Sequence, residues 1–215
     1  MGKDEVLNRI NQTGIIAILR ARSADQLLEA ADAIRAGGVQ AIEVTLTTSG
    51  ALQVVEEAVR RFHGEVAFGA GTVLDAESAW LAILAGAQFI VSPSLKPEVI
   101  TLCRRYHIPV FPGAFTPSEI LTAWETGADM VKLFPASLGG PALVKALKAP
   151  LPQVALMPVG GVSLENTAQY IQAGAAAVGV GSELLDIRLL EARHWAALTE
   201  RARRFIEEVQ RGRAD

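Results

Sequence analysis

Four similar segments of the chain end a helical pattern with glycine and then run into an apolar stretch. They read "AGGVQAIEV", "AGAQFIV", "TGADMVK" and "AGAAAVGV". Glycine suits the left-handed residue just past a helix end. A continuous apolar run is typical of a strand covered on both faces in a parallel sheet. The quasi-repeat therefore indicates regular alternation of helices with parallel strands.

Eight apolar runs of strand length recur along the chain, at residues 14–19, 41–45, 66–71, 89–92, 110–113, 130–133, 155–159 and 177–179. Helix signals lie between them, such as Thr116 and Glu119 at capping-box spacing around Pro117. Residues 3–12 read as an extra helix before the first run. No linker-like stretch interrupts the alternation. The pattern predicts an α/β fold, a single (β/α)₈ TIM barrel domain over residues 1–215, with an open doubly wound sheet as the alternative.

Charge and composition narrow the class of partner. The chain of 215 residues has a net charge of −3 and no basic block, so we expect no nucleic acid partner. The arginine-rich segment 201–213 reads as the solvated face of an amphipathic helix. No run is long enough for a membrane span, and the N-terminus lacks the apolar core of a signal peptide. A cytoplasmic protein is the expectation, and its single cysteine, Cys103, is expected to be a packed thiol.

A lysine interrupts the apolar run "DMVKLFPA". Because an unpaired ammonium group is costly to bury, Lys132 is expected either to pair with an acid or to do chemistry. Side chains alternate between the two faces of a strand, so Lys132 and Phe134 are predicted to point into the barrel. The same alternation in "AIEVTL" points Glu43 inward. Alternate strands share interior layers, and we predict that Glu43 and Lys132 approach each other at the barrel mouth.

Two roles for Lys132 are open on position alone. Burial favours the neutral amine, which can attack a carbonyl group and form a Schiff base. The Glu43 carboxyl would then move the protons. The alternative is a buried structural pair of Lys132 with Glu43.

Glycines follow the last two predicted strands. "PVGGVS" contains Gly160 and Gly161, and "GVGSELL" contains Gly181 and Ser182. The loops after strands seven and eight of such barrels often bind phosphate through backbone amides. Both motifs fall at the expected loops, which predicts a phosphate site there.

Further candidates stand at other strand ends. Arg20 is suited to a bidentate contact with a substrate carboxylate, or to an ordinary salt bridge at the rim. Thr72, Pro93 and Phe134 are expected to shape or touch the pocket. None of the three histidines lies at a strand end beside a second ligand, so neither a metal nor another cofactor is expected.

Six motifs occur together and in order: "IEVTL", "GAGTV", "IVSP", "VKLFPA", "PVGGV" and "VGVGSELL". In this the chain resembles the family of 2-keto-3-deoxy-6-phosphogluconate (KDPG) aldolase and 4-hydroxy-2-oxoglutarate (KHG) aldolase, over nearly its whole length. The resemblance implies a class I, metal-free lyase on a (β/α)₈ barrel, usually a homotrimer, in Entner–Doudoroff carbohydrate metabolism. Such an enzyme cleaves KDPG to pyruvate and glyceraldehyde 3-phosphate, or KHG to pyruvate and glyoxylate.

The resemblance also implies residue roles. Lys132 matches the Schiff-base lysine and Glu43 the acid/base. Thr72 and Phe134 match pocket residues, and Arg20 falls near the ligand's carboxylate or phosphate. The phosphate-loop positions match Gly160, Gly161, Gly181 and Ser182.

Two positions depart from the family pattern. Many members have arginine at the substrate-binding place taken here by Thr47, which would shift the carboxylate contact to Arg20. Many have threonine where this chain has Val159. Substrate preference therefore stays open among KDPG, its galactonate analogue and KHG. A phosphosugar isomerase or epimerase, and a non-catalytic barrel that binds a phosphorylated ligand, are the competing hypotheses.

Overall fold

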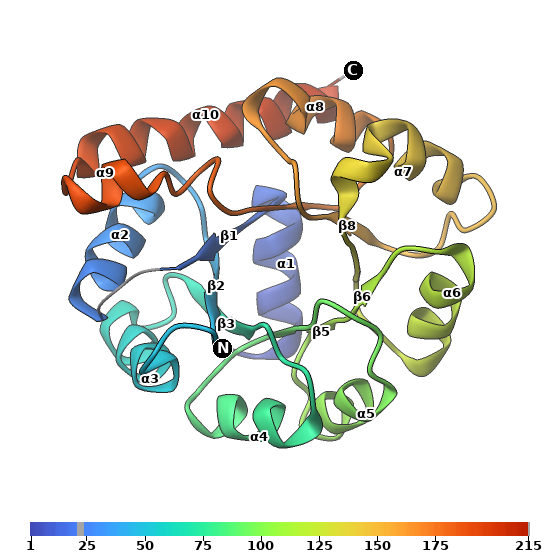
Figure 1. The fold of residues 1–215 in the computed structure, drawn as a ribbon, viewed down its shortest axis with the longest axis horizontal. Helices are drawn as coiled ribbons and strands as arrows, with labels where there is room; N and C mark the ends of the chain where they lie inside the picture. Colours follow the sequence, from blue (N-terminus) through green and yellow to red (C-terminus); the bar gives the residue numbers. More distant parts are fainter. Residues whose placement is uncertain (21–23, 215) are drawn as a thin grey trace.

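Parallel strands form the centre of the molecule, and helices surround them (Figure 1). The structure, a computed structural model, describes residues 1–20 and 24–214. The strands are β1 (Ile15–Leu19), β2 (Ala41–Thr45), β3 (Ala67–Gly71), β4 (Ile90–Val91), β5 (Val110–Phe111), β6 (Gly113–Ala114), β7 (Val131–Leu133), β8 (Leu156–Pro158) and β9 (Val178–Val180). The helices are α1 (Lys3–Thr13), α2 (Ala24–Ala36), α3 (Ala51–Phe62), α4 (Ala76–Leu84), α5 (Pro97–Arg105), α6 (Pro117–Thr126), η1 (Ala136–Leu138), α7 (Gly140–Lys148), α8 (Leu164–Gln172), α9 (Ile187–Glu191) and α10 (Trp195–Ala214).

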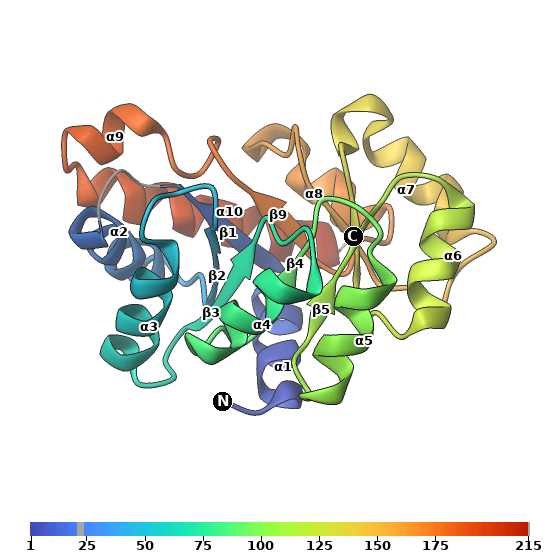
Figure 2. The same cartoon turned by 60° about the horizontal axis from the view of Figure 1, so that its bottom comes forward.

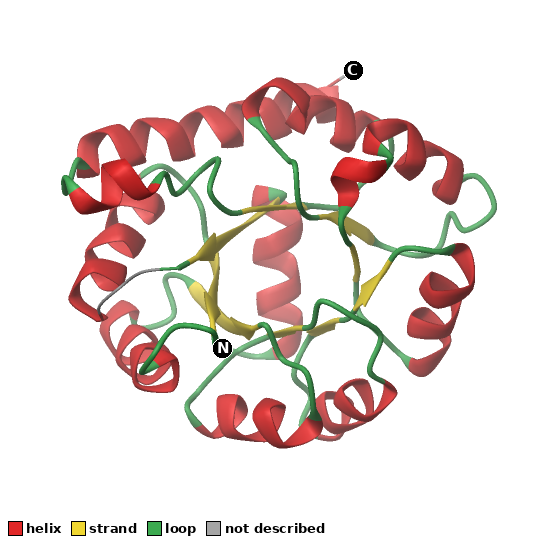
Figure 3. Cartoon of the chain, in the orientation of Figure 1, coloured by secondary structure: helices red, strands yellow, loops and turns green. Residues whose placement is uncertain are grey.

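The strands form a curled parallel arrangement (Figure 3). One sheet has the order β5-β4-β3-β2-β1-β9 and a second has the order β6-β7-β8. A bridge between Val159 and Gly179 links the end of β8 to β9. Every predicted strand segment is present as a strand, and all the pairs between them are parallel, so the α/β prediction is confirmed.

The fifth predicted strand, residues 110–113, is instead two short strands. Pro112 separates β5 from β6, because proline has no N–H group to donate to a sheet ladder. Its carbonyl still accepts a hydrogen bond from the Lys132 backbone N–H at 2.9 Å. β5 pairs with β4, whereas β6 pairs with β7, so the chain passes from one sheet to the other at this proline.

Apolar side chains form two separate clusters, one on each face of the strands. Ile42, Val44, Val131 and Leu133 belong to the larger cluster between strands and helices. The smaller, inner cluster gathers the side chains that point the other way, including Ile16, Ile18, Ala41, Ala67, Phe89, Val91, Phe111, Met130, Met157 and Ala177. The predicted alternation of faces along β2 and β7 is therefore confirmed.

Helix α1 covers one end of the inner cluster. Its buried side chains, Val6 and Ile10, pack with residues from the first positions of several strands. Figures 1 and 2 show α1 lying across the middle of the strands, at one end of them. The inner apolar space is thus closed at the amino ends of the strands, which leaves the carboxyl ends for a site.

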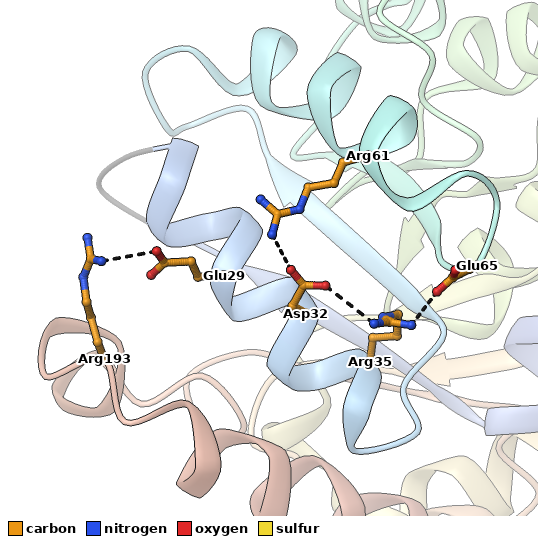
Figure 4. Close-up of polar contacts among 6 residues, drawn as sticks. All are labelled: Glu29, Asp32, Arg35, Arg61, Glu65 and Arg193. Carbon is orange, nitrogen blue, oxygen red and sulfur yellow. Dashed lines mark hydrogen bonds and ion pairs between the residues drawn. The ribbon is translucent and has the colours of Figure 1, made fainter.

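Ion pairs connect the surfaces of helices α2 and α3 and the segment between α9 and α10. Arg193 contacts Glu29 at 3.2 Å, and Arg61 contacts Asp32 at 2.5 Å (Figure 4). Arg35 contacts both Asp32 and Glu65. Exposed pairs contribute little each, about 0–1 kcal/mol, but the Arg193 pair helps to hold the segment before α10 against α2.

Helix caps follow the sequence signals. The Glu119 carboxylate accepts a hydrogen bond from the Thr116 backbone N–H at 2.8 Å, and the Thr116 hydroxyl accepts one from the Glu119 N–H at 3.3 Å. This capping box begins α6 at Pro117, as predicted. No helix within the described part of the chain is both long and apolar enough to span a membrane.

Candidate active site

Lys132 lies on the inner face of β7 and is only 6% exposed. Its neighbours in the ladder are Gly113 on β6 and Met157 on β8. The ammonium nitrogen lies 5.3 Å from the centroid of the Phe134 ring, close enough for a cation–π contact. The four other lysines of the chain are at least partly exposed, which matches the prediction that this lysine alone sits in a strand core.

Glu43 lies on the inner face of β2 and is 1% exposed. Burial raises the pKa of its carboxyl group above 4.5, and the positive charges of Lys132 and then Arg20 oppose that rise. The Oε2 atom is buried without a hydrogen-bond partner. The carboxyl group therefore tends to hold its proton in a dry setting, with one oxygen free to receive another group.

Lys132 and Glu43 are the two buried charged side chains among the described residues. The positive charge of Lys132 lowers the pKa of Glu43, against the larger effect of burial. Yet no ion pair within 4.0 Å joins them among the described residues, and the Oε2 atom of Glu43 has no hydrogen-bond partner. A purely structural buried pair is stable only when the two groups contact each other closely. The lack of a close contact therefore disfavours a purely structural pairing of Lys132 with Glu43.

Gly71 makes room for the Glu43 carboxyl group. A Cβ atom built on Gly71 would lie 2.1 Å from Oε1 and 2.7 Å from Cδ of Glu43. Gly71 and Thr45 are paired in register on β3 and β2, so the glycine stands beside the strand that carries the acid. The "GAGTV" motif thus supplies space, as its small residues suggest.

We expect Gly71→Ala to lower the free energy of unfolding by about 1–3 kcal/mol, because the added methyl group overpacks the Glu43 side chain. Denaturant titration measures the change. Repeating the substitution in a Glu43→Ala background removes the clashing carboxyl group, so the cost of the alanine should fall there. An equal cost in both backgrounds would show that Glu43 is not what Gly71 accommodates.

A cavity of about 690 Å³ lies at the carboxyl ends of β1, β8 and β9. Its lining includes six predicted site residues: Arg20, Phe134, Gly160, Gly161, Gly181 and Ser182. Both glycines of "PVGGVS" have positive φ, +88° and +79°, a conformation in which other residues are strained. Lys132 does not line the cavity itself, but the Phe134 ring that lines it is the ring beside the Lys132 nitrogen.

Five predicted residues lie outside the lining of this cavity. Two of them, Lys132 and Glu43, are buried on the inner face of the strands. Thr47 is exposed after β2, and Thr72 and Pro93 are half-buried after β3 and β4. A hollow of similar size, about 710 Å³, lies between α8 and α10 around Gly212 and Arg213. Its lining holds none of the predicted site residues. The cavity at the strand ends is therefore the candidate active site.

Four charged residues line the cavity that sequence reasoning did not assign to it. They are Glu183, Asp186, Arg188 and Arg201. The interpretation of the segment 201–213 as a solvated face is wrong for Arg201, because its side chain is 29% exposed and turns toward the cavity. A pattern along one helix does not reveal which strand ends that helix will face.

Two observations bear on other chemistries. Burial raises the pKa of the Cys103 thiol to about 12, with the nearby Asp129 charge adding to the effect, so this cysteine is a packed and unreactive thiol. Within residues 1–20 and 24–214 there is no group of three or more His, Cys, Asp or Glu side chains placed to hold a metal ion.

Comparison with known proteins gives consistent matches. A family model described as KDPG and KHG aldolase matches residues 6–201. The chain is 41% identical over 171 residues to the 2-dehydro-3-deoxy-6-phosphogalactonate aldolase of Escherichia coli K12, which covers 79% of this chain and 83% of that enzyme. It is 30% identical over 207 residues to the 2-dehydro-3-deoxy-phosphogluconate aldolase of Haemophilus influenzae, which covers 96% of this chain and 97% of that enzyme.

A solved structure of high similarity bears on the chemistry. It is that of the KDPG aldolase from Legionella pneumophila with pyruvate captured at low pH as a covalent carbinolamine intermediate. The two chains are 29% identical and superpose with a TM-score of 0.86, over 92% of this chain and 96% of the other.

Proposed function

Because this chain belongs to the KDPG and KHG aldolase family, we propose that it is a class I aldolase whose Lys132 amine forms the Schiff base with a 2-keto acid. Aldolases of this kind are carbon–carbon lyases. The observation that carries the residue assignment is the single buried lysine of the described chain, whose charge acts on the buried acid Glu43 and whose nitrogen lies beside the Phe134 ring of the cavity wall.

The Lys132 amine attacks the C2 carbonyl group of the substrate and forms a carbinolamine. Loss of water then gives an iminium ion, which withdraws electrons from the C3–C4 bond. Removal of the proton from the C4 hydroxyl group breaks that bond and releases an aldehyde. The enamine that remains on Lys132 takes a proton at C3, and hydrolysis releases pyruvate.

Glu43 moves the protons in these steps. A carboxyl group with a raised pKa is a better acid/base near neutral pH than an ordinary glutamate. Its Oε2 atom, on the inner face of β2, has no hydrogen-bond partner and is available to a substrate hydroxyl group or a water molecule.

Arg20 and the glycine loops bind the two ends of the substrate. Arg20 lines the cavity and lies close enough to Glu43 to lower its pKa, so we assign it to the pyruvyl carboxylate in place of the arginine that Thr47 replaces. The backbone amides around Gly160, Gly161 and Gly181, with the Ser182 hydroxyl group, bind the substrate phosphate. Thr72, Pro93 and Phe134 shape the pocket.

The substrate is a phosphorylated 2-keto-3-deoxy sugar acid, either KDPG or its galactonate analogue, and the products are pyruvate and glyceraldehyde 3-phosphate. A panel of KDPG, the galactonate analogue and KHG tests this, with pyruvate release followed by a coupled dehydrogenase. We expect turnover of at least one phosphorylated substrate, and unchanged turnover after chelator treatment. Loss of turnover with chelator would favour a metal-dependent isomerase or epimerase, and tight binding without turnover would favour a non-catalytic phospho-ligand protein.

The scaffold belongs to the same proposal. We infer that residues 1–215 form one closed (β/α)₈ barrel domain with α1 as an extra helix, which the Pro112 junction and the Val159–Gly179 bridge support. We also infer a cytoplasmic homotrimer. Exposed leucines on and before α4, namely Leu74, Leu81 and Leu84, provide an apolar surface of the kind found at subunit contacts, and sedimentation measures the assembly.

A further inference from the structure

Charged side chains from separate parts of the chain line the cavity. Arg20 is one of them, and its charge lowers the pKa of Glu43. The others are Glu183, Asp186 and Arg188 of one loop-and-helix segment, and Arg201 of α10. Gly160, Gly161 and Gly181 line the same cavity. Since Arg20 and Lys132 both act on Glu43, the remaining charged groups of the lining, including Arg201, are left for the far end of a substrate held at Lys132.

The Arg201 guanidinium group is incompletely paired. Its Nη2 atom lies 3.6 Å from Glu183 Oε2, and its Nη1 atom lies 4.0 Å from Asp186 Oδ2. Both distances exceed the roughly 2.7–2.9 Å of a charge-assisted hydrogen bond. The Nε atom is buried and has no hydrogen-bond partner. The donors of this side chain are thus available to a ligand with several acceptor oxygens.

The neighbouring acids do not neutralise Arg201 fully. Asp186 is already committed to Arg188, whose backbone N–H, Nε and Nη2 donate to it at 2.9, 3.1 and 2.7 Å. Those hydrogen bonds, from the side chain first and then the backbone, lower the pKa of the Asp186 carboxyl group to about 2. Glu183 is 52% exposed on its side chain and is free to turn toward water.

Helix α10 holds Arg201 in place. The helix runs from Trp195 to Ala214, and Leu198, Ala202 and Phe205 on it are fully buried. Thr199 donates a hydrogen bond to the Ala33 carbonyl oxygen at 2.8 Å, which ties the same turn of α10 to α2. Because the backbone that carries Arg201 is already held in place, ligand binding has to order only the side chain, which keeps the entropy cost of binding small.

We propose that Arg201 is a specificity-determining residue that binds the phosphate monoester at the far end of the substrate, alongside the glycine-loop amides. This inference rests on the proposed aldolase function and deepens it. A guanidinium group presents a planar fork of donors that matches two phosphate oxygens. The weak contact of Arg201 with the Glu183 carboxylate, at 3.6 Å, would be replaced by contacts with the phosphate.

The test compares Arg201→Gln with the unchanged enzyme on a matched pair of substrates, the phosphorylated sugar acid that it cleaves and the same acid without its phosphate. We expect kcat/KM to fall by about 10- to 100-fold for the phosphorylated substrate, mainly through KM, because a charge-assisted contact is lost. For the unphosphorylated acid we expect less than about a threefold change, since that substrate never used the contact. Arg201→Lys should fall between, because it keeps the charge without the fork.

Arg203→Gln is the matched control, because Arg203 is an exposed arginine of the same helix that pairs with Glu200. It should leave both substrates unchanged. A second measurement does not need turnover: inorganic phosphate should raise the melting temperature of the unchanged protein and of Arg203→Gln, and raise that of Arg201→Gln much less.

The outcomes separate this inference from the proposed function. Equal loss on both substrates, or an unchanged ratio between them, would assign Arg201 a structural role and overturn the inference. Failure of the aldolase assignment would look different, with no pyruvate adduct and no cleavage by the unchanged protein. Borohydride trapping with pyruvate should succeed in Arg201→Gln, because pyruvate carries no phosphate.

Discussion

Lys132→Ala and Lys132→Arg are both expected to reduce aldol cleavage by roughly ten-thousand-fold or more, because each removes the nucleophile on which the reaction proceeds. Arginine retains positive charge in the same strand position, but a guanidinium group is always protonated and does not form a Schiff base. Steady-state assay of pyruvate release measures the loss. Retained turnover in Lys132→Arg would mean that charge rather than imine formation drives the reaction.

Reductive trapping identifies which lysine forms the Schiff base. Treatment with borohydride in the presence of pyruvate should add one reduced pyruvate to the peptide that contains Lys132, as judged by mass spectrometry. Lys145→Ala is the matched control, because Lys145 is an exposed lysine on α7, and it should be trapped as efficiently as the unchanged protein. An unlabelled Lys132 in an active enzyme contradicts the mechanism.

Glu43→Gln is expected to lower kcat by about 100- to 10,000-fold, the range typical of a lost general acid or base. The amide keeps the size and shape of the side chain beside Gly71, so the effect is one of proton transfer rather than packing. A smaller effect on pyruvate trapping is expected than on cleavage, since the amine itself remains. An activity within tenfold of the unchanged enzyme would remove Glu43 from the mechanism.

Glu43→Gln should also raise the free energy of unfolding at neutral pH, relative to the unchanged protein. Burial raises the pKa of Glu43 above 4.5, so between 4.5 and that raised value the folded protein holds a proton that the unfolded chain has lost. Stability of the unchanged protein therefore falls as pH rises through this window, by about 1.4 kcal/mol for each unit of pKa difference. Glutamine does not titrate and escapes this loss.

Denaturant titrations across pH measure this difference. We expect Glu43→Gln and the unchanged protein to have similar free energies of unfolding near pH 4, and the variant to be the more stable at pH 7–8. Glu98→Gln, on the surface of α5, should show no such gain. A variant that is less stable at neutral pH would show that the attraction of Lys132 and Arg20 outweighs the cost of burying the charge.

Much of the predicted fold followed from rules that involve only a few neighbouring residues. Alternation of side chains along a strand is a property of the extended backbone, so it placed Lys132 and Glu43 on the inner face before any contact was known. Glycine past a helix end is equally local. Gly127 ends α6 at φ +101°, and its N–H group bonds back to the Ala123 carbonyl oxygen. The eight predicted strand segments and the parallel arrangement followed from such signals.

Other features depend on which elements meet, and no short-range period encodes them. The chain changes partner strand at Pro112 because a missing N–H group matters only once a neighbour is in place. Thr47, Thr72 and Pro93 follow strands as expected, yet they lie outside the cavity because its opening is displaced toward β1, β8 and β9. Arg201 enters the site because α10 packs beside the strand ends that carry Gly181 and Arg20.

The sequence by itself determined the order of helices and strands, the face of each strand and the presence of one lysine in a strand core, since these follow from backbone geometry over a few residues. Only the tertiary structure decided that Lys132 and Glu43 are near enough for the lysine charge to act on the acid without an ion pair within 4.0 Å, that Glu43 is desolvated enough for its pKa to rise, and that Arg201 joins the cavity. Those properties arise from distances and burial summed over residues far apart in the chain, which no single segment contains.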